Sequence, residues 1–211
     1  MIKKVIYQCR IGSGYSFYEP LYINPDWDYL CFTDDTELVS EYYKIINVSS
    51  INGDNRRTAK KIKTLAHEYV SNYDISIYIG SEFKIRCDLN NLIKNNFSKN
   101  IDMACIRHNK RNCIYKEAKK IIKLGYDKKE IVQKQMKKYH EEGFPGEMGL
   151  AAFFIFIRWH NRDIVKNFMK QWYHEILEGS SRDLLSFNYV LWKIPLRIKY
   201  MSWKRYYPLF K

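Results

Sequence analysis

The feature that most constrains this fold is an unbroken apolar run from Ala151 to Ile157. The run is much shorter than the roughly 20 residues that cross a membrane. It also lacks the alternation of a strand with one face in water. It is typical of a central strand buried on both faces. Such a strand needs helices on both sides of its sheet, so the run predicts an α/β fold.

Strand-like and helical segments alternate along the rest of the chain. Strands are expected at 3–9, 28–34, 42–48, 75–79, 83–85 and 101–107, and helices at 55–70, 113–142, 163–177 and 181–192. Gly125 and Asp127 predict a break inside the lysine-rich segment 113–142. This recurrence favours a mostly parallel central sheet flanked by helices. No repeat or linker is visible, so a single domain over 1–211 is expected, with 196–211 as a basic aromatic C-terminal tail.

Composition narrows the class of protein. A hydrophobic content of 46% argues against a disordered chain. The 36 Lys and Arg residues exceed the 23 Asp and Glu residues, and the net charge of +13 attracts anions without choosing among nucleic acid, acidic lipids and phosphorylated small molecules. The five cysteines show no C-x-x-C spacing, so neither a disulfide framework nor a zinc site is indicated. Without a signal-peptide core or a membrane-length apolar run, the protein is expected to be cytoplasmic.

Four cationic side chains recur at helical spacing after the third expected strand. Arg56, Lys60, Lys63 and His67 fall within about 60° of arc on one helix. A row of cations beside a pocket can stabilise the charge that develops on a leaving nucleoside diphosphate. A solvated helix face would show the same spacing, so the pattern alone leaves both interpretations open.

Polar residues also follow two expected strands. Gly80, Ser81 and Glu82 form a turn after strand 75–79, and His108 and Arg111 follow strand 101–107. Ligands of open α/β sheets bind outside the carboxyl ends of strands, so both segments are well placed for a site. Histidine can serve as a base or a hydrogen-bond donor near neutral pH. Ordinary turns and surface loops would look similar.

Opposite charges stand together at the start of the last expected helix, where Arg182 precedes Asp183. Ser180 and Ser181 are candidate helix caps, with Asp183 in the first turn. The segment is either a capping arrangement or a functional one in which Asp183 acts near a reacting sugar.

In order along the chain, these pieces resemble a glycosyltransferase-like family found in plant proteins and in bacterial polysaccharide gene clusters. The resemblance spans nearly the whole chain, and seven motifs in the same order make it specific. The motifs are Tyr29-x-Cys31-Phe32-Thr33-Asp34; Arg56-x3-Lys60-x2-Lys63-x3-His67; Tyr73-Asp74-x-Ser76-Ile77-Tyr78-Ile79; His108-x2-Arg111-x-Cys113-Ile114-Tyr115-x-Glu117-Ala118; Gln135-x3-Tyr139-x3-Gly143-Phe144-Pro145; Ile157-Arg158-x-His160-Asn161; and Trp172-x2-Glu175 leading to Arg182-Asp183-x-Leu185-Ser186-Phe187.

The resemblance implies a Rossmann-like fold of the GT-A type and transfer of a hexosyl or related group. The donor would be a UDP- or GDP-linked sugar and the acceptor a glycan or a lipid-linked molecule, in surface polysaccharide or glycoconjugate synthesis. The expected nucleotide-sugar-binding residues are Asp34, Arg56, Lys60, Lys63, His67, Gly80, Ser81, Arg111 and Arg182. Asp183 and His108 are the expected catalytic residues, and in an inverting reaction Asp183 would be the general base.

The chain departs from the family at the turn expected to hold Mn²⁺ or Mg²⁺. Gly80 stands where the family has Asp, so Glu82 or Asp88 would have to supply the carboxylate that a hard cation prefers. Otherwise the basic stripe replaces the metal, or the chain has lost activity. Leu184 stands where the family usually has Gln, which removes an amide that could bind a sugar hydroxyl.

Two other classes of function remain open. In the tail, aromatic residues interleave with cations between Lys199 and Tyr207, as in a basic nucleic-acid-binding module, although nucleic acid is the less favoured partner. The same tail could rest on an anionic membrane as a peripheral contact at the inner face, or simply pack on the domain. A catalytically degenerate GT-A fold acting as an interaction partner is the third alternative.

Overall fold

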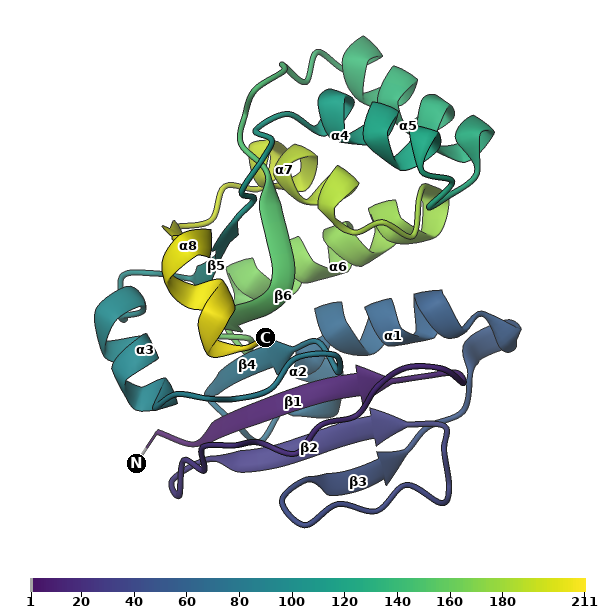
Figure 1. Cartoon of the computed structure of the whole chain (residues 1–211). Coiled ribbons are helices and arrows are strands. Elements are labelled where there is room, and N and C mark those ends of the chain that lie inside the picture. The colour runs from purple at the N-terminus through teal and green to yellow at the C-terminus, as the bar shows by residue number, and fades with distance from the viewer. Residues whose placement is uncertain (1) are drawn as a thin grey trace.

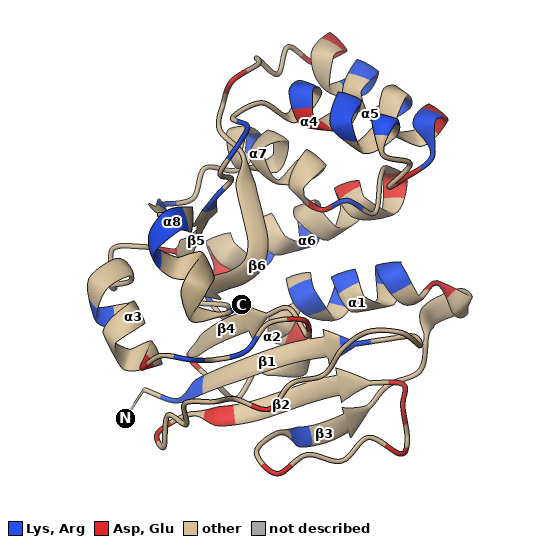
Figure 2. Cartoon of the chain, in the orientation of Figure 1, with Lys and Arg blue, Asp and Glu red and all other residues tan. Residues whose placement is uncertain are grey.

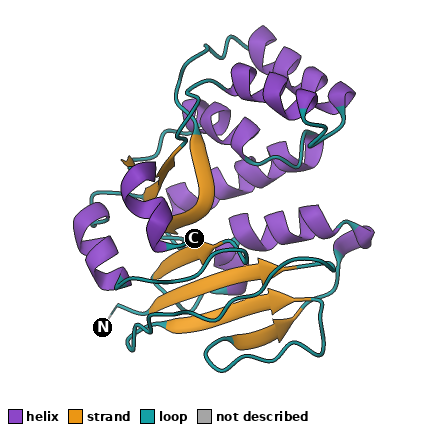
Figure 3. Ribbon diagram, viewed as in Figure 1, coloured by secondary structure: helices purple, strands orange, loops and turns teal. Residues whose placement is uncertain are grey.

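A seven-stranded sheet forms the centre of the computed structural model, which describes residues 2–211 (Figure 1 and Figure 3). The strands are β1 (Lys4–Arg10), β2 (Asp28–Thr33), β3 (Lys44–Asn47), β4 (Ile75–Ile79), β5 (Met103–Arg107), β6 (Ala151–Arg158) and β7 (Ile198–Met201). They lie in the order β3-β2-β1-β4-β6-β5-β7. Only β6 runs antiparallel to its neighbours; all other pairings are parallel. The expected α/β class with a mostly parallel, helix-flanked sheet is confirmed.

Helices cover both faces of this sheet. They are α1 (Asn55–Thr64), α2 (Ala66–Tyr69), α3 (Leu89–Asn96), α4 (Ile114–Lys123), α5 (Lys129–Glu141), α6 (Asp163–Glu178), α7 (Leu184–Lys193) and α8 (Trp203–Tyr206), with short 3₁₀ turns at Ile51–Gly53 and Tyr207–Leu209. One face is covered by α1, α2, α6 and α7, and the hairpin of α4 and α5 packs outside α7 (Figure 1). The other face is covered by α3 and α8. The break expected at Gly125 and Asp127 separates α4 from α5.

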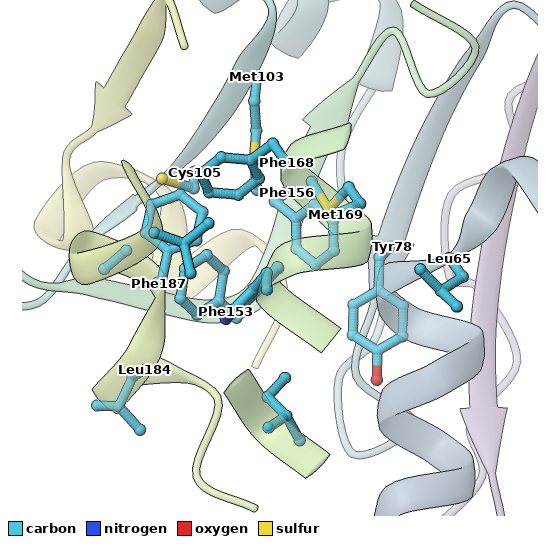
Figure 4. Close-up of a cluster of buried hydrophobic side chains, with 14 of the residues drawn as sticks. Leu65, Tyr78, Met103, Cys105, Phe153, Phe156, Phe168, Met169, Leu184 and Phe187 are labelled. Carbon is cyan, nitrogen blue, oxygen red and sulfur yellow. The ribbon is translucent and has the colours of Figure 1, made fainter. Parts of the chain in front are cut away.

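The core is divided between the two faces by the alternation of strand side chains. Tyr7 of β1 lies in one apolar cluster, whereas its neighbour Ile6 lies in the other. On the first face, Phe153 of β6 packs among aromatic residues of α6 and α7, including Phe168 and Phe187 (Figure 4). Burying side chains of this size contributes about 1.5–3 kcal/mol each.

A buried arginine ends the first helix earlier than the periodicity predicts. The guanidinium of Arg158, which is 0% exposed, donates to the carbonyl oxygens of Lys63 at 2.7 Å and Thr64 at 2.8 Å. Leu65 then leaves the helical conformation, with φ −89° and ψ 44°. The continuous helix expected over 55–70 is therefore wrong, and His67 lies on the separate helix α2.

A second expectation, a strand at 83–85, is also wrong. The backbone N–H groups of Lys84 and Arg86 donate to the carbonyls of Phe210 at 2.6 Å and Leu209 at 3.1 Å. Because those carbonyls belong to the turn at the C-terminal end, the segment has no strand to pair with.

The central strand β6 is irregular where it approaches the sheet edge. In its pairing with β5, Cys105 lies opposite Phe156, but the next residue, Ile106, lies opposite Ala152. Residues 153–155 are therefore left without partners in β5. Such irregularities often occur next to functional sites, because they redirect side chains and free backbone groups.

The tail is built into the sheet and the core. β7 pairs in parallel with β5, and Tyr206 and Phe210 are buried at 6% and 0% exposure. No helix within residues 2–211 has the length and apolar character that crossing a membrane requires.

Candidate active site

A cavity of about 490 Å³ opens where the carboxyl ends of β1, β4 and β5 meet the start of β6. Residues from α1, from the turn after β4, from the loop after β5 and from the segment before α7 line it. Among the expected site residues, the lining includes Arg56, Lys60, Lys63, Gly80, Ser81, Glu82, His108, Arg182 and Asp183. The fold thus brings together side chains that are up to 127 positions apart, from Arg56 to Asp183.

Three expected residues are not among the described residues that line the cavity. His67 lies beyond the break between α1 and α2 and does not line the cavity. The prediction that four cations form one stripe on one helix is therefore wrong. The carboxylate of Asp34 accepts hydrogen bonds from the backbone N–H of Gly12 at 2.9 and 3.0 Å. Arg111 pairs with Glu117, which does line the cavity.

The centre of the cavity wall is an ion cluster. One oxygen of Asp183, Oδ2, accepts hydrogen bonds from Lys60 Nζ at 2.8 Å and Lys63 Nζ at 2.7 Å. Lys63 Nζ also donates to the carbonyl oxygen of Phe153 at 2.8 Å, in the irregular part of β6. The side chains of Lys63 and Asp183 are only 6% and 9% exposed. Two ammonium groups therefore share one buried carboxylate.

The surroundings shift the titration of this cluster in two ways. Burial opposes the charge of Asp183, but Lys60 and Lys63 outweigh it and hold the pKa of that carboxyl well below its usual range. Burial lowers the pKa of Lys63 to about 8, against the attraction of Asp183. The ammonium of Lys63 also lies 4.8 Å from the ring centre of Tyr78 and 5.5 Å from that of Phe153, which favours its charged form.

The segment before α7 is fixed differently from the expected capping. Asp183 stands at the N-cap position, but its side chain makes no capping hydrogen bond. Ser180 and Ser181 bind Asp127 instead: Asp127 Oδ2 accepts from Ser180 Oγ at 2.6 Å and from the backbone N–H of Ser181 at 3.0 Å. The indole N–H of Trp172 donates to the carbonyl of Asp183 at 3.0 Å. These contacts hold the Asp183 carboxylate toward α1.

Two further cations at the cavity have no ion-pair partner within residues 2–211. Arg56 is exposed near the start of α1, and Arg182 is exposed with its guanidinium 5.3 Å from the ring centre of Tyr126. Figure 2 shows several basic residues along α1, which lies below α6 in this view. Free cations beside a neutralised carboxylate make this wall suited to an anion.

His108 is held in one protonation state by its own loop. Its Nδ1 accepts from the backbone N–H groups of Lys110 at 3.2 Å and Arg111 at 3.1 Å. Burial lowers the pKa of His108, so the neutral ring is favoured. Because Nδ1 accepts, Nε2 carries the proton, and His108 offers the cavity a hydrogen-bond donor.

The residues at the Gly80 turn do not fit a divalent cation held by the protein. Within residues 2–211, no group of three or more His, Cys, Asp or Glu side chains is arranged to bind a metal. Asp183 is occupied by two lysines, and Asp88 caps α3 through the N–H groups of Asn90 and Asn91, away from the cavity. Glu82 is left as a single carboxylate, whereas hard cations prefer several oxygen ligands.

The aromatic part of the lining was not expected from the sequence. Tyr78, Phe83, Phe153, Phe154 and Trp203 all border the cavity. Trp203 carried one available signal, because it lies in the basic aromatic tail. Phe153 and Phe154 carried none, since the irregular pairing of β6 cannot be read from an apolar run.

Comparison with known proteins finds one matching family. The family described as "TOD1/MUCI70, glycosyltransferase-like domain" matches residues 31–204. Among curated proteins, no relative matches the chain. The chain is similar to the solved apo structure of WbbM, a bifunctional glycosyltransferase, with a TM-score of 0.48 and 10% identity; the match covers 95% of this chain and 38% of that one.

The family match covers most of the sequence, from the middle of β2 to the start of α8, and includes every cavity residue on α1, β4, β6 and the segment before α7. The chain therefore belongs to the TOD1/MUCI70 glycosyltransferase-like domain family.

Proposed function

We propose that this protein is a nucleotide-sugar-dependent glycosyltransferase whose donor diphosphate binds the cationic wall of the cavity. The observation that carries the proposal is the joint presence of Arg56 and Arg182, without ion-pair partners in residues 2–211, beside the shared cluster of Lys60, Lys63 and Asp183. Together these groups leave the wall positively charged. A diphosphate is the part of a sugar donor that such a wall would bind.

In the proposed reaction, the bond between the anomeric carbon and the diphosphate breaks, and the nucleoside diphosphate leaves with the electron pair. The acceptor oxygen bonds to the anomeric carbon and releases its proton to a base at the cavity. Fixed cations lower the barrier because they stabilise the charge that develops on the leaving group. Asp183 keeps Lys60 and Lys63 in place beside the sugar, and His108 Nε2–H orients a hydroxyl of the donor or acceptor.

The donor is a UDP- or GDP-linked sugar, and the acceptor is a glycan or a lipid-linked molecule used in polysaccharide or glycoconjugate synthesis. The net charge of +13 supports contact with an anionic membrane surface that carries such acceptors. Because the turn at Gly80 offers only Glu82, we propose that cations of the chain do most of the work of Mn²⁺ or Mg²⁺.

The test is a binding and turnover panel. UDP- and GDP-linked sugars are added with and without manganese, and thermal stabilisation and release of nucleoside diphosphate are followed. Arg56→Ala is the informative variant because Arg56 is exposed and unpaired, so its loss should not disturb the fold. Losing one charge-assisted contact worth about 1.5–3 kcal/mol should weaken donor binding by about 10-fold or more.

Lys134→Ala is the matched control, because Lys134 is exposed on α5, away from the cavity. It should leave donor binding unchanged. Donor binding without turnover would identify a degenerate enzyme. Gly80→Asp tests this interpretation, because a Cβ at Gly80 would lie 3.8 Å from the carbonyl oxygen of Phe154 and 3.2 Å from the ring of Phe83, so that only the ring has to shift. Tight binding of DNA or RNA with no response to any nucleotide-sugar would contradict the proposal.

A further inference from the structure

The cavity has a second wall of different chemistry from the cationic one. Phe83, Phe154 and Trp203 line it from the turn after β4, from β6 and from α8. All three pack with the apolar cluster on the α3 and α8 face of the sheet, whereas the cations come from the α1 and α7 side. The cavity therefore joins an anion-binding half to an aromatic half.

The aromatic half is held rigidly. The rings of Phe83 and Phe154 stack with centres 4.8 Å apart, and Trp203 stacks on Tyr207 with centres 4.5 Å apart. Phe154 and Trp203 pack edge to face with ring centres 5.2 Å apart, which connects the two stacks. Such a surface is organised before a ligand arrives, so little side-chain freedom is lost on binding.

One carboxylate at this half is uncommitted. Three acidic residues line the cavity, and two of them are neutralised: Asp183 by two lysines and Glu117 by Arg111. The third, Glu82, directly precedes Phe83, is exposed, and has no hydrogen-bond or ion-pair partner among residues 2–211. A carboxylate held by two ammonium groups is a weak base, whereas a free one can accept a proton from a hydroxyl.

Flat aromatic faces beside hydrogen-bonding groups suit one class of ligand. The C–H bonds on one side of a sugar ring carry weak positive charge and pack against the negative face of an aromatic ring. The hydroxyls at the ring edge need polar partners, here the carboxylate of Glu82 and the Nε2–H of His108.

We propose that the aromatic half is the acceptor site, that it takes a saccharide whose ring packs against Phe83 and Trp203, and that Glu82 is the general base for its hydroxyl. This inference rests on the proposed glycosyl transfer. The acceptor O–H proton moves to the Glu82 carboxylate as the oxygen bonds to the anomeric carbon, and the nucleoside diphosphate leaves with the electrons of the broken bond.

Saccharide binding is tested first, by saturation-transfer NMR with maltotriose, cellotriose and N,N′-diacetylchitobiose at millimolar concentration. Trp203→Ala should weaken binding by about 10-fold or more. Trp192→Ala is the matched control, since Trp192 is 38% exposed on α7 and does not line the cavity. Absence of saccharide binding in the unmodified protein, or equal binding by Trp203→Ala, would overturn the acceptor site.

The role of Glu82 is tested with the saccharide that binds best. Glu82→Gln should lower kcat by about 100-fold or more while the KM for the donor stays within a factor of two, and Glu82→Asp should restore part of the rate. Glu68→Gln is the control, because Glu68 is exposed on α2. A Glu82→Gln variant with unchanged kcat removes Glu82 as the base.

The two proposals fail in different ways. If the chain binds saccharides through Trp203 but binds no nucleotide-sugar, glycosyl transfer is contradicted and a saccharide site is supported. If nucleotide-sugar binding depends on Arg56 but Trp203→Ala leaves saccharide binding unchanged, the donor site is supported and the acceptor site is contradicted.

Discussion

At the scale of single residues, Lys63 is a lysine whose buried surroundings oppose its positive charge. It is almost fully buried, it shares the Asp183 carboxylate with Lys60, and the rings of Tyr78 and Phe153 surround its ammonium. Two cations and one carboxylate leave one positive charge in excess, and burial disfavours that excess. The result is a lysine that can lose its proton close to neutral pH.

This predicts a pH dependence of nucleotide binding. Burial brings the pKa of Lys63 to about 8 from 10.5, so the charge that attracts a diphosphate is present below pH 8 and is lost as the pH rises through 8. UDP affinity, measured by calorimetry between pH 7 and 9.5, should fall by about 10-fold with a midpoint at or above 8. The midpoint can only move upward with ligand bound, because the diphosphate favours the protonated form.

Lys63→Met should abolish this fall in UDP affinity with pH. The fold should be kept, because the methionine side chain is unbranched and apolar and because Lys60 remains to pair with Asp183. Stability changes in the opposite direction from binding: between pH 8 and 10.5 the unfolded chain holds a proton that the folded chain has released, so unfolding becomes less favourable as the pH rises there. An affinity that is flat from pH 7 to 9.5 would show that Lys63 does not contribute to binding.

At the scale of elements, sequence periodicity predicted which segments are helices and strands but not where they are interrupted. The apolar run 151–157 correctly predicted a buried central strand. No residue in the segment 55–70 marks the end of α1. That end is imposed by Arg158, which comes from a strand far along the chain. Pairing partners of this kind are tertiary and leave no local pattern, which is also why Asp183 could not be distinguished from a helix cap.

The motif Arg158-x-His160-Asn161 is explained by the same region. His160 Nε2 lies 2.9 Å from the carbonyl oxygen of Val70, and the Asn161 amide donates to the carbonyls of Ser71 at 2.7 Å and Tyr73 at 2.9 Å. Like Arg158, these side chains satisfy backbone groups where α1 and α2 end. The motif therefore maintains the position of α1, and with it the cationic wall, without touching the cavity.

Arg158→Met should destabilise the protein strongly. It leaves the carbonyl of Thr64 without its buried donor, whereas the carbonyl of Lys63 keeps the hydroxyl of Tyr7, which donates to it at 2.7 Å. The unsatisfied carbonyl costs about 1–3 kcal/mol and each other lost hydrogen bond about 1 kcal/mol, so a loss of about 2–4 kcal/mol in the free energy of unfolding is expected from urea denaturation. Arg158→Lys should recover only part, because an ammonium lacks the planar fork that reaches several acceptors. A loss below about 1 kcal/mol would show that water replaces the guanidinium.

The Ser180 to Asp183 segment depends on close packing at Gly179. A Cβ at this position would lie 2.4 Å from Gln135 Nε2, and Gln135 is itself buried and accepts from the N–H of Ser180 at 3.1 Å. Gly179→Ala should therefore lower the free energy of unfolding by about 1–3 kcal/mol and weaken nucleotide binding. Gly146→Ala is the control, since its Cβ would meet only Cys113 Sγ, at 3.7 Å. Equal stability of the two variants in urea would mean that Gln135 moves aside freely.

At the scale of the whole molecule, the cavity lies where the two faces of the sheet meet at one edge. The face bearing α1 and α7 supplies the cations, and the face bearing α3 and α8 supplies the aromatic residues. The C-terminal tail is required for this arrangement, because β7 pairs with β5 and α8 carries Trp203. From the sequence alone, this tail could bind nucleic acid, rest on a membrane or pack on the domain. In the structure it packs on the domain and also contributes Trp203 to the cavity.

The C-terminal tail supports the segment that follows the Gly80 turn. Phe210 is fully buried although it is the penultimate residue, and the carbonyls of Phe210 and Leu209 accept from the backbone of Lys84 and Arg86 beside the Gly80 turn. Phe210→Ala should lower the free energy of unfolding by about 3–5 kcal/mol, as for other buried aromatic residues. Hydrogen exchange should show the largest loss of protection at Lys84 and Arg86, since those two amides donate to the tail. Leu209→Ala, at a half-buried position, should cost about 1 kcal/mol or less.

If Phe210→Ala instead unfolds at the same urea concentration as the unmodified protein, the tail is separable from the core. Trp203 then loses the support that its place at the acceptor site requires.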